Sequence, residues 1–314
     1  MALGSNKLFE YLEGSRSVLV AGAGGGCDIY CGVPFYLSLK ERGVDVHLAN
    51  LTFANLIDNK RHSDALFEVN ASDSFRQYAP ERHLSAWLAH KGSEVPVYAF
   101  ARTGVKPISE AYQQLVEMLN IDAILLVDGG TDSLMRGDEF HLATPHEDIA
   151  SLIAATSTAV DKVALACTAF GVDAYHGICH AHFLENTAYF MQNGGYLGVF
   201  SLDPGDPEVQ AYVEAVRFLG EMQPSDPSIV NTSLVSSIEG FYGDHHANHR
   251  TAGSKLWINP LMSLCWAFEA RPVVDRIMYT ARVEGTTDYM LLKSEIGKFR
   301  ATLENKREFE DIPV

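Results

Sequence analysis

Short runs of apolar residues alternate along the chain with longer stretches in which apolar positions repeat at helical spacing. A short, continuously apolar run is typical of a strand buried on both faces, and helical spacing predicts a helix that covers a sheet. The predicted strands are 17–22, 44–49, 95–100, 121–127, 162–168 and 195–200. The predicted helices between them are 33–42, 81–90, 109–119, 147–159 and 179–192.

The alternation of strands and helices predicts the fold class. Repeated βαβ units form a parallel sheet with right-handed crossovers and helices on both faces. We therefore expect an α/β fold with a doubly wound, mostly parallel sheet, arranged as a Rossmann-like three-layer sandwich with a C-terminal extension. Large α/β folds reach a length of 314 residues without division. Residues 1–314 would form a single domain, with 1–206 as its regular βαβ core.

The pattern is less regular in the C-terminal part, residues 207–314. It predicts a helix at 207–220, a strand at 232–238 and an amphipathic helix between Lys293 and Glu310. Segment 239–260 is rich in glycine, histidine and aromatic residues. We interpret it as a functional loop, because long loops in compact proteins commonly carry function.

Composition narrows the classes of partner and compartment. The 40 acidic and 24 basic residues give a formal charge of −16 without a basic stripe, so we expect no nucleic-acid partner. Five scattered cysteines indicate a reducing, cytoplasmic setting. The chain has no apolar run of transmembrane length and no secretory leader, so we expect no membrane association. The expected partner is a small molecule, and a homo-oligomer would fit a large acidic α/β protein.

The first predicted strand ends in a glycine-rich turn, at the edge of the sheet where open α/β folds bind ligands. Its candidate ligand-binding residues are Gly24, Gly25, Gly26, Cys27 and Asp28. Glycines let backbone amides approach an anion at the start of the next helix. Asp28 would either cap that helix or bind a ligand hydroxyl, amine or metal. Cys27 is either a nucleophile with a lowered pKa or a small buried residue.

The same turn departs from the nucleotide fingerprints. Cys27 takes the third glycine position of the dinucleotide pattern, and Asn50 stands where the second strand would carry an acid for the ribose. The Gly-Lys-Ser/Thr ending of a phosphate-binding P-loop is also absent from the turn. An enzyme dependent on NAD or S-adenosylmethionine is therefore an alternative that rests on the turn alone. A turn that serves only packing is another.

A second polar block follows the predicted strand 121–127 and reaches the same edge of the sheet. Its candidate site residues are Asp128, Gly129, Gly130, Thr131, Asp132, Ser133, Arg136 and Asp138. Carboxylates that crowd one strand end repel each other unless a cation, a proton or a polyhydroxy ligand shares them. We therefore predict a ligand-binding block, and the alternative is an acid-rich loop with Arg136 as its counter-ion.

Six histidines gather in two stretches, at 176–182 and 245–249. Imidazoles with nearby carboxylates bind divalent metals, and they also act as general bases. The candidate catalytic residues are Asp128, Asp132, His245 and His246. The candidate metal ligands are Asp128, Asp132, His180, Asp244, His245 and His249. The sequence leaves the identity of the metal open.

Three motifs stand out as a set: the run from Val20 to Asp28, the block from Asp128 to Glu139, and Ile258-Asn259-Pro260-Leu261. Together they resemble a family catalogued as domain of unknown function 1152, found in archaea and bacteria. The resemblance spans nearly the full chain and implies a Rossmann-like fold, but no reaction. The positions carried over are Gly24, Gly25, Gly26, Asp28, Asp128, Gly129, Gly130, Asp132 and Asp138.

These features predict an enzyme that acts on a small polar metabolite by hydrolysis or group transfer. The glycine turn would hold an anionic group, while Asp128, Asp132 and Asp138 would bind a hydroxyl-rich or cationic part, with a divalent metal as the candidate cofactor. One of the histidines would serve as general acid or base. The main alternative is a nucleotide- or metabolite-binding protein without catalytic activity.

Overall fold

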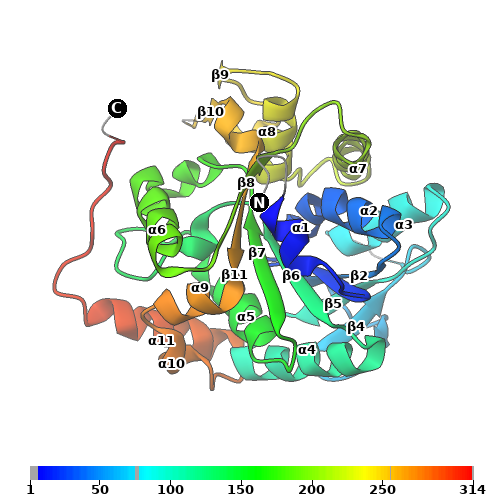
Figure 1. The fold of residues 1–314 in the computed structure, drawn as a ribbon, viewed down its shortest axis with the longest axis horizontal. Coiled ribbons are helices and arrows are strands. Elements are labelled where there is room, and N and C mark those ends of the chain that lie inside the picture. Colours follow the sequence, from blue (N-terminus) through cyan, green and yellow to red (C-terminus); the bar gives the residue numbers. More distant parts are fainter. Residues whose placement is uncertain (1–5, 75–77, 255, 313–314) are drawn as a thin grey trace.

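The structure is a computed structural model that describes residues 6–74, 78–254 and 256–312. In the described residues, nine strands form one sheet in the order β3-β4-β5-β2-β1-β6-β7-β11-β8 (Figure 1). The strands are β1 (Ser17–Gly22), β2 (Asp45–Thr52), β3 (Lys60–Arg61), β4 (Leu66–Val69), β5 (Val97–Ala101), β6 (Ala123–Asp128), β7 (Lys162–Cys167), β8 (Tyr196–Ser201) and β11 (Leu264–Glu269).

The middle of the sheet is parallel and consists of the neighbouring strands β5, β2, β1, β6 and β7. Pairing becomes antiparallel on both sides, where β4 joins β5 and where β11 inserts between β7 and β8. Chain order reverses at β1, whose neighbours β2 and β6 lead to opposite edges of the sheet. Such a reversal is the switch point at which open α/β sheets leave a crevice for ligands.

Helices cover both faces of this sheet (Figure 1). One face packs against α1 (Lys7–Leu12), α2 (Val33–Glu41), α3 (Pro80–His90), α7 (Pro207–Met222) and α8 (Ile229–Ile238). The other packs against α4 (Val105–Leu119), α5 (Pro145–Thr156), α6 (His180–Asn193), α9 (Ala270–Arg276), α10 (Thr280–Val283) and α11 (Tyr289–Ala301). The predicted α/β class, with a mostly parallel sheet in a Rossmann-like sandwich, is confirmed.

The two cores explain why the first strand is apolar from Val18 onward. Val18 and Val20 of β1 belong to the core on one face, and Leu19 and Ala21 belong to the core on the other. Successive side chains of a strand point to opposite faces, so a central strand covered on both faces has no polar side. From Val18 the strand therefore runs without a polar side chain up to the glycine turn that borders the crevice.

Helix α8 occupies the segment for which a strand at 232–238 is predicted, and that prediction is wrong. The buried hydrophobic residues Leu234, Val235 and Ile238 are spaced as on one face of a helix, and the buried Asn231 lies on the same face. The Ser228 side chain caps the helix by accepting a hydrogen bond from the amide of Asn231. The hydroxyl of Ser233 donates to the carbonyl of Ile229 one turn earlier. β-Branched residues favour strands and serines disfavour helix interiors, but the cap and the packing against α7 outweigh these preferences.

The C-terminal part joins the sheet through β11, which pairs with both β7 and β8. Segment 239–260 is not wholly irregular, because β9 (Gly243–Asp244) pairs with β10 (Trp257–Ile258) inside it. Helix α11 ends at Ala301, so the helix predicted up to Glu310 is too long. Beyond α11, Arg307 bridges to Glu139, and this contact holds the end of the chain against the loop after β6.

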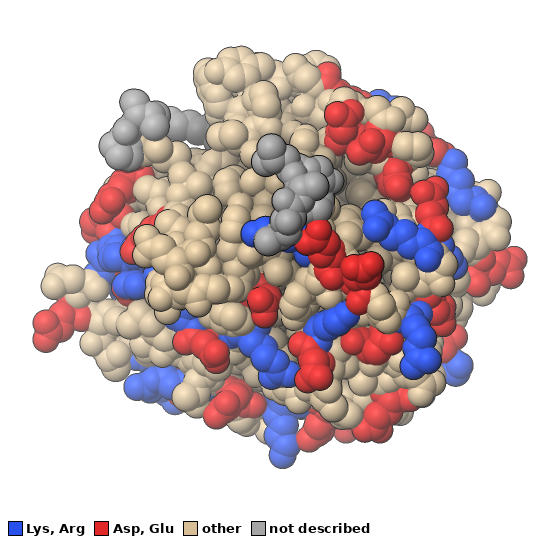
Figure 2. Space-filling view, in the orientation of Figure 1, with Lys and Arg blue, Asp and Glu red and all other residues tan. Residues whose placement is uncertain are grey.

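Both charges are mixed on the face of the molecule shown in Figure 2, where Lys and Arg side chains are interspersed with Asp and Glu. That face carries no concentrated basic patch. In the part of the chain that the structure describes, no helix combines the length and apolar composition that crossing a membrane requires. All five cysteines are free thiols. Compartment, partners and oligomeric state stay predictions.

Candidate functional site

A cavity of about 450 Å³ lies at the carboxyl ends of β1, β6 and β7, beside the switch point of the sheet. Its lining is dominated by acidic side chains from four separate segments. These are Asp28, Asp128, Asp132, Glu147, Asp148 and Asp173. The cavity is therefore the place where the chemistry of this fold is to be sought.

Hydroxyl groups of the block after β6 orient two of these carboxylates. Oδ2 of Asp128 accepts hydrogen bonds from the hydroxyl and the amide of Ser133. Oδ2 of Asp173 accepts from the amide of Thr131 at 2.6 Å and from its hydroxyl at 3.3 Å. Thr131 and Ser133, predicted as ligand-binding residues, thus hold carboxylates in position.

Two further carboxylates are held by neighbouring backbone. Oδ2 of Asp132 accepts from the amide of Thr144 at 3.1 Å and from its hydroxyl at 3.3 Å. Oδ2 of Asp28 accepts from the amide of Gly24 at 2.8 Å. Each of these bonds fixes the position of one carboxylate at the cavity.

Asp148 differs from these acids because it has no hydrogen-bond partner on either oxygen among the described residues. It is only 3% exposed, so almost none of its surface is in contact with bulk solvent. It lies in the first turn of α5, where the helix dipole stabilises a negative charge. This stabilisation is smaller than the free energy lost when a carboxylate is removed from water. A buried carboxyl group without a partner either keeps its proton or is charged beside a cation.

Burial raises the pKa of these acids above the ordinary range. Burial and the adjacent charge of Asp132 raise the pKa of Asp128 to about 7. Burial is also the main cause of the raised pKa of Asp28, Asp148 and Asp173, and the charges of neighbouring carboxylates add to it. Without a cation, the cluster must therefore retain protons near neutral pH.

Three of the acids have the geometry of a metal site. One oxygen from each of Asp28, Asp128 and Asp148 lies within 4.8 Å of the other two. Oxygen ligands of one Mg²⁺ or Ca²⁺ ion are at most about 4–5 Å apart, given metal–oxygen distances of 2.0–2.6 Å. An all-oxygen set suits Mg²⁺, Mn²⁺ or Ca²⁺ better than Zn²⁺. Of the predicted metal ligands only Asp128 belongs to this group, and Asp28 was predicted to bind a ligand or metal.

The glycines around the cavity make room for its carboxylates. A Cβ atom on Gly24 would lie 2.6 Å from Oδ2 of Asp28 and 2.8 Å from Oδ1 of Asp148. On Gly129 it would lie 2.8 Å from Oδ1 of Asp28. Any side chain at these two positions would collide with a carboxylate, so only glycine fits there.

Two amides of the glycine turn are already used inside the protein. The amide of Gly24 donates to Asp28, and the amide of Gly26 donates to the carbonyl of Leu51 at 3.0 Å. Gly25 and Gly26 adopt φ angles of 84° and 61°, which glycine tolerates best. The turn therefore positions Asp28 rather than presenting a row of free amides to an anion.

Substitution of Gly24 tests this role. We expect Gly24→Ala to weaken divalent-metal binding by about tenfold or more, because the added methyl group must displace Asp28 or Asp148. Gly220→Ala is the control, since nothing lies within 4 Å of the added Cβ on α7, and it should stabilise the protein by up to about 1 kcal/mol. Metal titration by calorimetry measures both, and equal affinities in the two variants would contradict the steric argument.

The structure places Arg136 and Asp138 outside the cavity lining. Their side chains form an ion pair, and Arg307 adds a second pair to Asp138 at 3.0 Å. Partial burial acts to raise the pKa of Asp138, but the hydrogen bond from Arg136 and the charge of Arg307 outweigh it and lower the pKa. This arrangement corresponds to the alternative in which Arg136 is an internal counter-ion.

The histidines of the late segment lie apart from the carboxylates. The ring of His245 stacks on Phe241 with a centroid distance of 4.1 Å. His246 pairs with Asp244 at 2.9 Å beside the β9–β10 hairpin, and His249 begins a short 3₁₀ helix. None of these four polar residues lines the cavity.

His180 is also absent from the cavity lining. Its ring packs against those of Phe170 and Phe309, with centroid distances of 5.3 Å and 6.3 Å.

The histidines in the cavity lining are His146 and His176. His176 belongs to a stretch that the sequence singles out, but His146 was missed. Burial lowers the pKa of His146, which favours its neutral form near pH 7.

Cys27 does not have the lowered pKa that a nucleophile requires. Burial raises the pKa of its thiol to about 12, and its Sγ lies 3.1 Å from the hydroxyl of Tyr78. The short helix that follows does not compensate for this desolvation. Cys27 is therefore a packing residue behind the turn, and it is not among the residues that line the cavity.

Several residues of the cavity lining were not among the predicted site residues, and they include Arg102, Asp148, Asp173 and Tyr289. Arg102 and Asp173 follow β5 and β7, so the rule of polar residues after strands places both at this edge, although neither was assigned to the site. Asp148 stands on the buried face of α5 with Leu152, and an acid on an apolar helix face was a visible signal. No local signal pointed to Tyr289.

Fold and cavity together define an α/β protein with a carboxylate-lined crevice at its switch point. The chain belongs to the family described as protein of unknown function (DUF1152), whose model matches residues 19–310. No curated protein and no solved structure matched the chain. The matched span contains every carboxylate of the cavity.

Proposed function

We propose that this protein is a divalent-metal-dependent enzyme that acts on a small polar metabolite in the carboxylate cavity, by hydrolysis or group transfer. The observation that carries the proposal is Asp148, which is buried without a partner next to Asp28 and Asp128. Structural acids are normally paired or hydrogen-bonded when buried. An acid that lacks both, in a cluster of acids, is explained by a cation that completes it.

The roles follow from the contacts of each acid. Asp28, Asp128 and Asp148 would hold Mg²⁺ or Mn²⁺, and a cation there would polarise an oxygen of the substrate. Asp132 accepts hydrogen bonds from Thr144 through one oxygen, and burial raises its pKa above that of an ordinary carboxyl group. A carboxyl group with a raised pKa can serve as a general acid or base. We assign proton transfer to Asp132, and to His176 as the nearby histidine of the lining.

A dinucleotide or S-adenosylmethionine cofactor has weaker support. Asn50, at the position of the ribose-binding acid, is fully buried and donates to Glu81 at 2.6 Å and to the carbonyl of Gly26 at 2.7 Å. It is thus occupied within the protein rather than turned toward the crevice.

Metabolite profiling tests the enzymatic proposal against binding without turnover. The purified protein, incubated with a small-molecule extract and Mn²⁺, should deplete a substrate and form a product that mass spectrometry detects. Asp148→Asn should abolish this conversion, whereas Asp275→Asn, at an exposed position of α9, should retain it. Retention of a bound metabolite with no product in the wild-type sample would favour a binding protein instead.

A further inference from the structure

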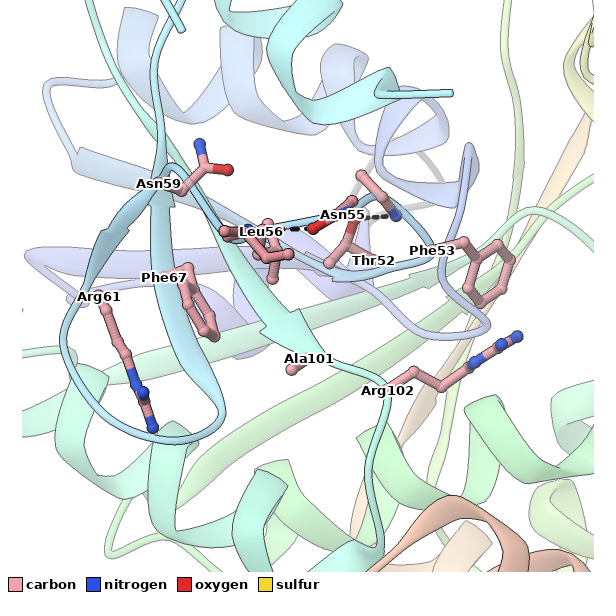
Figure 3. A pocket seen from close by; sticks show the side chains of 11 residues that line it. Thr52, Phe53, Asn55, Leu56, Asn59, Arg61, Phe67, Ala101 and Arg102 are labelled. Carbon is pink, nitrogen blue, oxygen red and sulfur yellow. Dashed lines mark hydrogen bonds between the residues drawn. The ribbon is translucent and has the colours of Figure 1, made fainter. Parts of the chain in front are cut away.

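Arg102 occupies a junction between two cavities. It follows β5 and lines the carboxylate cavity, and it also lines a neighbouring cavity of about 590 Å³ (Figure 3). Phe53 is shared by both cavities in the same way. Figure 3 shows the Arg102 side chain extending beneath the ring of Phe53, while Arg61 lies at the far end of the neighbouring cavity. Arg102 is thus the basic side chain common to both linings.

Two aromatic rings hold the guanidinium of Arg102 in place. Its central carbon lies 5.2 Å from the ring centre of Phe53 and 4.6 Å from that of Tyr289. Tyr289 is itself anchored by donating a hydrogen bond to Glu147 at 3.0 Å. A guanidinium ordered between aromatic faces has lost much of its rotamer freedom, so less entropy is lost when it binds a ligand.

The donors of this guanidinium are not used within the protein. In the described residues, Arg102 donates no hydrogen bond, and its approach to Glu147 is a long contact of 4.0 Å. Its side chain is 47% exposed, so a ligand can reach it from the cavities. Five N–H donors in a planar fork match the oxygens of a phosphate or a carboxylate group.

We infer that Arg102 binds an oxyanion group of the substrate, a phosphate or a carboxylate, while the metal site holds the same group or an adjacent oxygen from the other side. This inference rests on the proposed function, because the acids alone would repel an anion and a bound divalent cation is needed to offset them. The remainder of the substrate extends past Phe53 into the neighbouring cavity. The substrate class is therefore an anionic small molecule, bound between Arg102 and the metal.

The test measures metal binding and oxyanion binding separately on the full chain. Calorimetry first gives the Mg²⁺ affinity of the wild type and of Arg102→Met. Inorganic phosphate and malonate are then titrated into each Mg²⁺-saturated protein as the phosphate and carboxylate arms. Arg42→Met is the matched control, because Arg42 also lies over a ring, that of Phe9, but beyond the end of α2 and among residues that line a different cavity.

We expect Mg²⁺ affinity to be unchanged or raised in Arg102→Met, since a nearby positive charge is removed. Affinity for the oxyanion should fall by about tenfold or more, as for loss of a charged hydrogen bond, with a partial loss in Arg102→Lys and none in Arg42→Met. Binding of phosphate or of malonate to the wild type shows whether the oxyanion group of the substrate is a phosphate or a carboxylate. Mg²⁺ binding without binding of either oxyanion, or equal oxyanion binding in Arg102→Met, overturns this inference alone. Failure of Mg²⁺ to bind the wild type overturns the proposed function as well.

Discussion

In metal-free buffer at about pH 8, the Asp148→Asn variant is expected to unfold at a higher temperature than the wild type. Asp148 is buried, has no hydrogen-bond partner among the described residues and feels the charges of its acidic neighbours. An amide of the same shape removes that repulsion, which we expect to stabilise the metal-free fold by about 1–3 kcal/mol, or a few degrees. A site residue whose removal stabilises the protein is one retained for function.

Saturating Mg²⁺ should reverse this order of stability. A ligand that binds only the native state stabilises it by about 2.7 kcal/mol at 100 times its Kd, and the variant should lose most of that gain. Thermal unfolding in EDTA and in Mg²⁺ measures both effects, with Asp275→Asn as the exposed control. A variant that is destabilised in EDTA, yet gains as much from Mg²⁺ as the wild type, would show that Asp148 is a structural residue.

The metal-free wild type should also lose stability as the pH rises from about 5 to about 8. The pKa of Asp128 is about 7 in the folded protein against an ordinary 3.8, so between these values the native state binds more protons than the unfolded chain. Stability then falls with rising pH, by up to about 1.4 kcal/mol per pH unit for each such group. The raised pKa values of Asp28, Asp148 and Asp173 act in the same direction.

Bound metal should remove most of this pH dependence. A cation favours the charged carboxylates, so saturating Mg²⁺ stabilises the protein more at pH 8 than at pH 5. Urea unfolding at several pH values, with EDTA and with Mg²⁺, checks the two slopes. A metal-free stability that rises between pH 5 and pH 8 would mean that the acids are ionised and compensated without any metal.

The position of the site was predictable from the sequence because it depends on the sheet. Buried strands end in polar residues, and parallel neighbours bring those ends to one edge. Asp28 follows β1 and Asp128 ends β6, and because these strands are paired the structure places both acids in one cavity. The glycines beside them were also identified, but their amides were assigned to a ligand when the space they leave is taken by carboxylates.

The remaining members of the site depend on packing between distant segments. Asp148 reaches the cavity because α5 starts above the ends of β1 and β6, which no local pattern specifies. Tyr289 arrives from the first turn of α11, more than half the chain away from β1. His245 and His246 resembled catalytic groups by composition, but the β9–β10 hairpin holds their segment away from the cavity lining.

The most direct test of the central claim is a calorimetric titration of the wild-type protein with Mn²⁺ near pH 7, repeated in two buffers of different ionisation enthalpy. The account predicts saturable binding accompanied by the release of about one proton or more, because a cation displaces the protons that the buried acids retain. Binding without proton release, or no saturable binding at millimolar Mn²⁺, would contradict it.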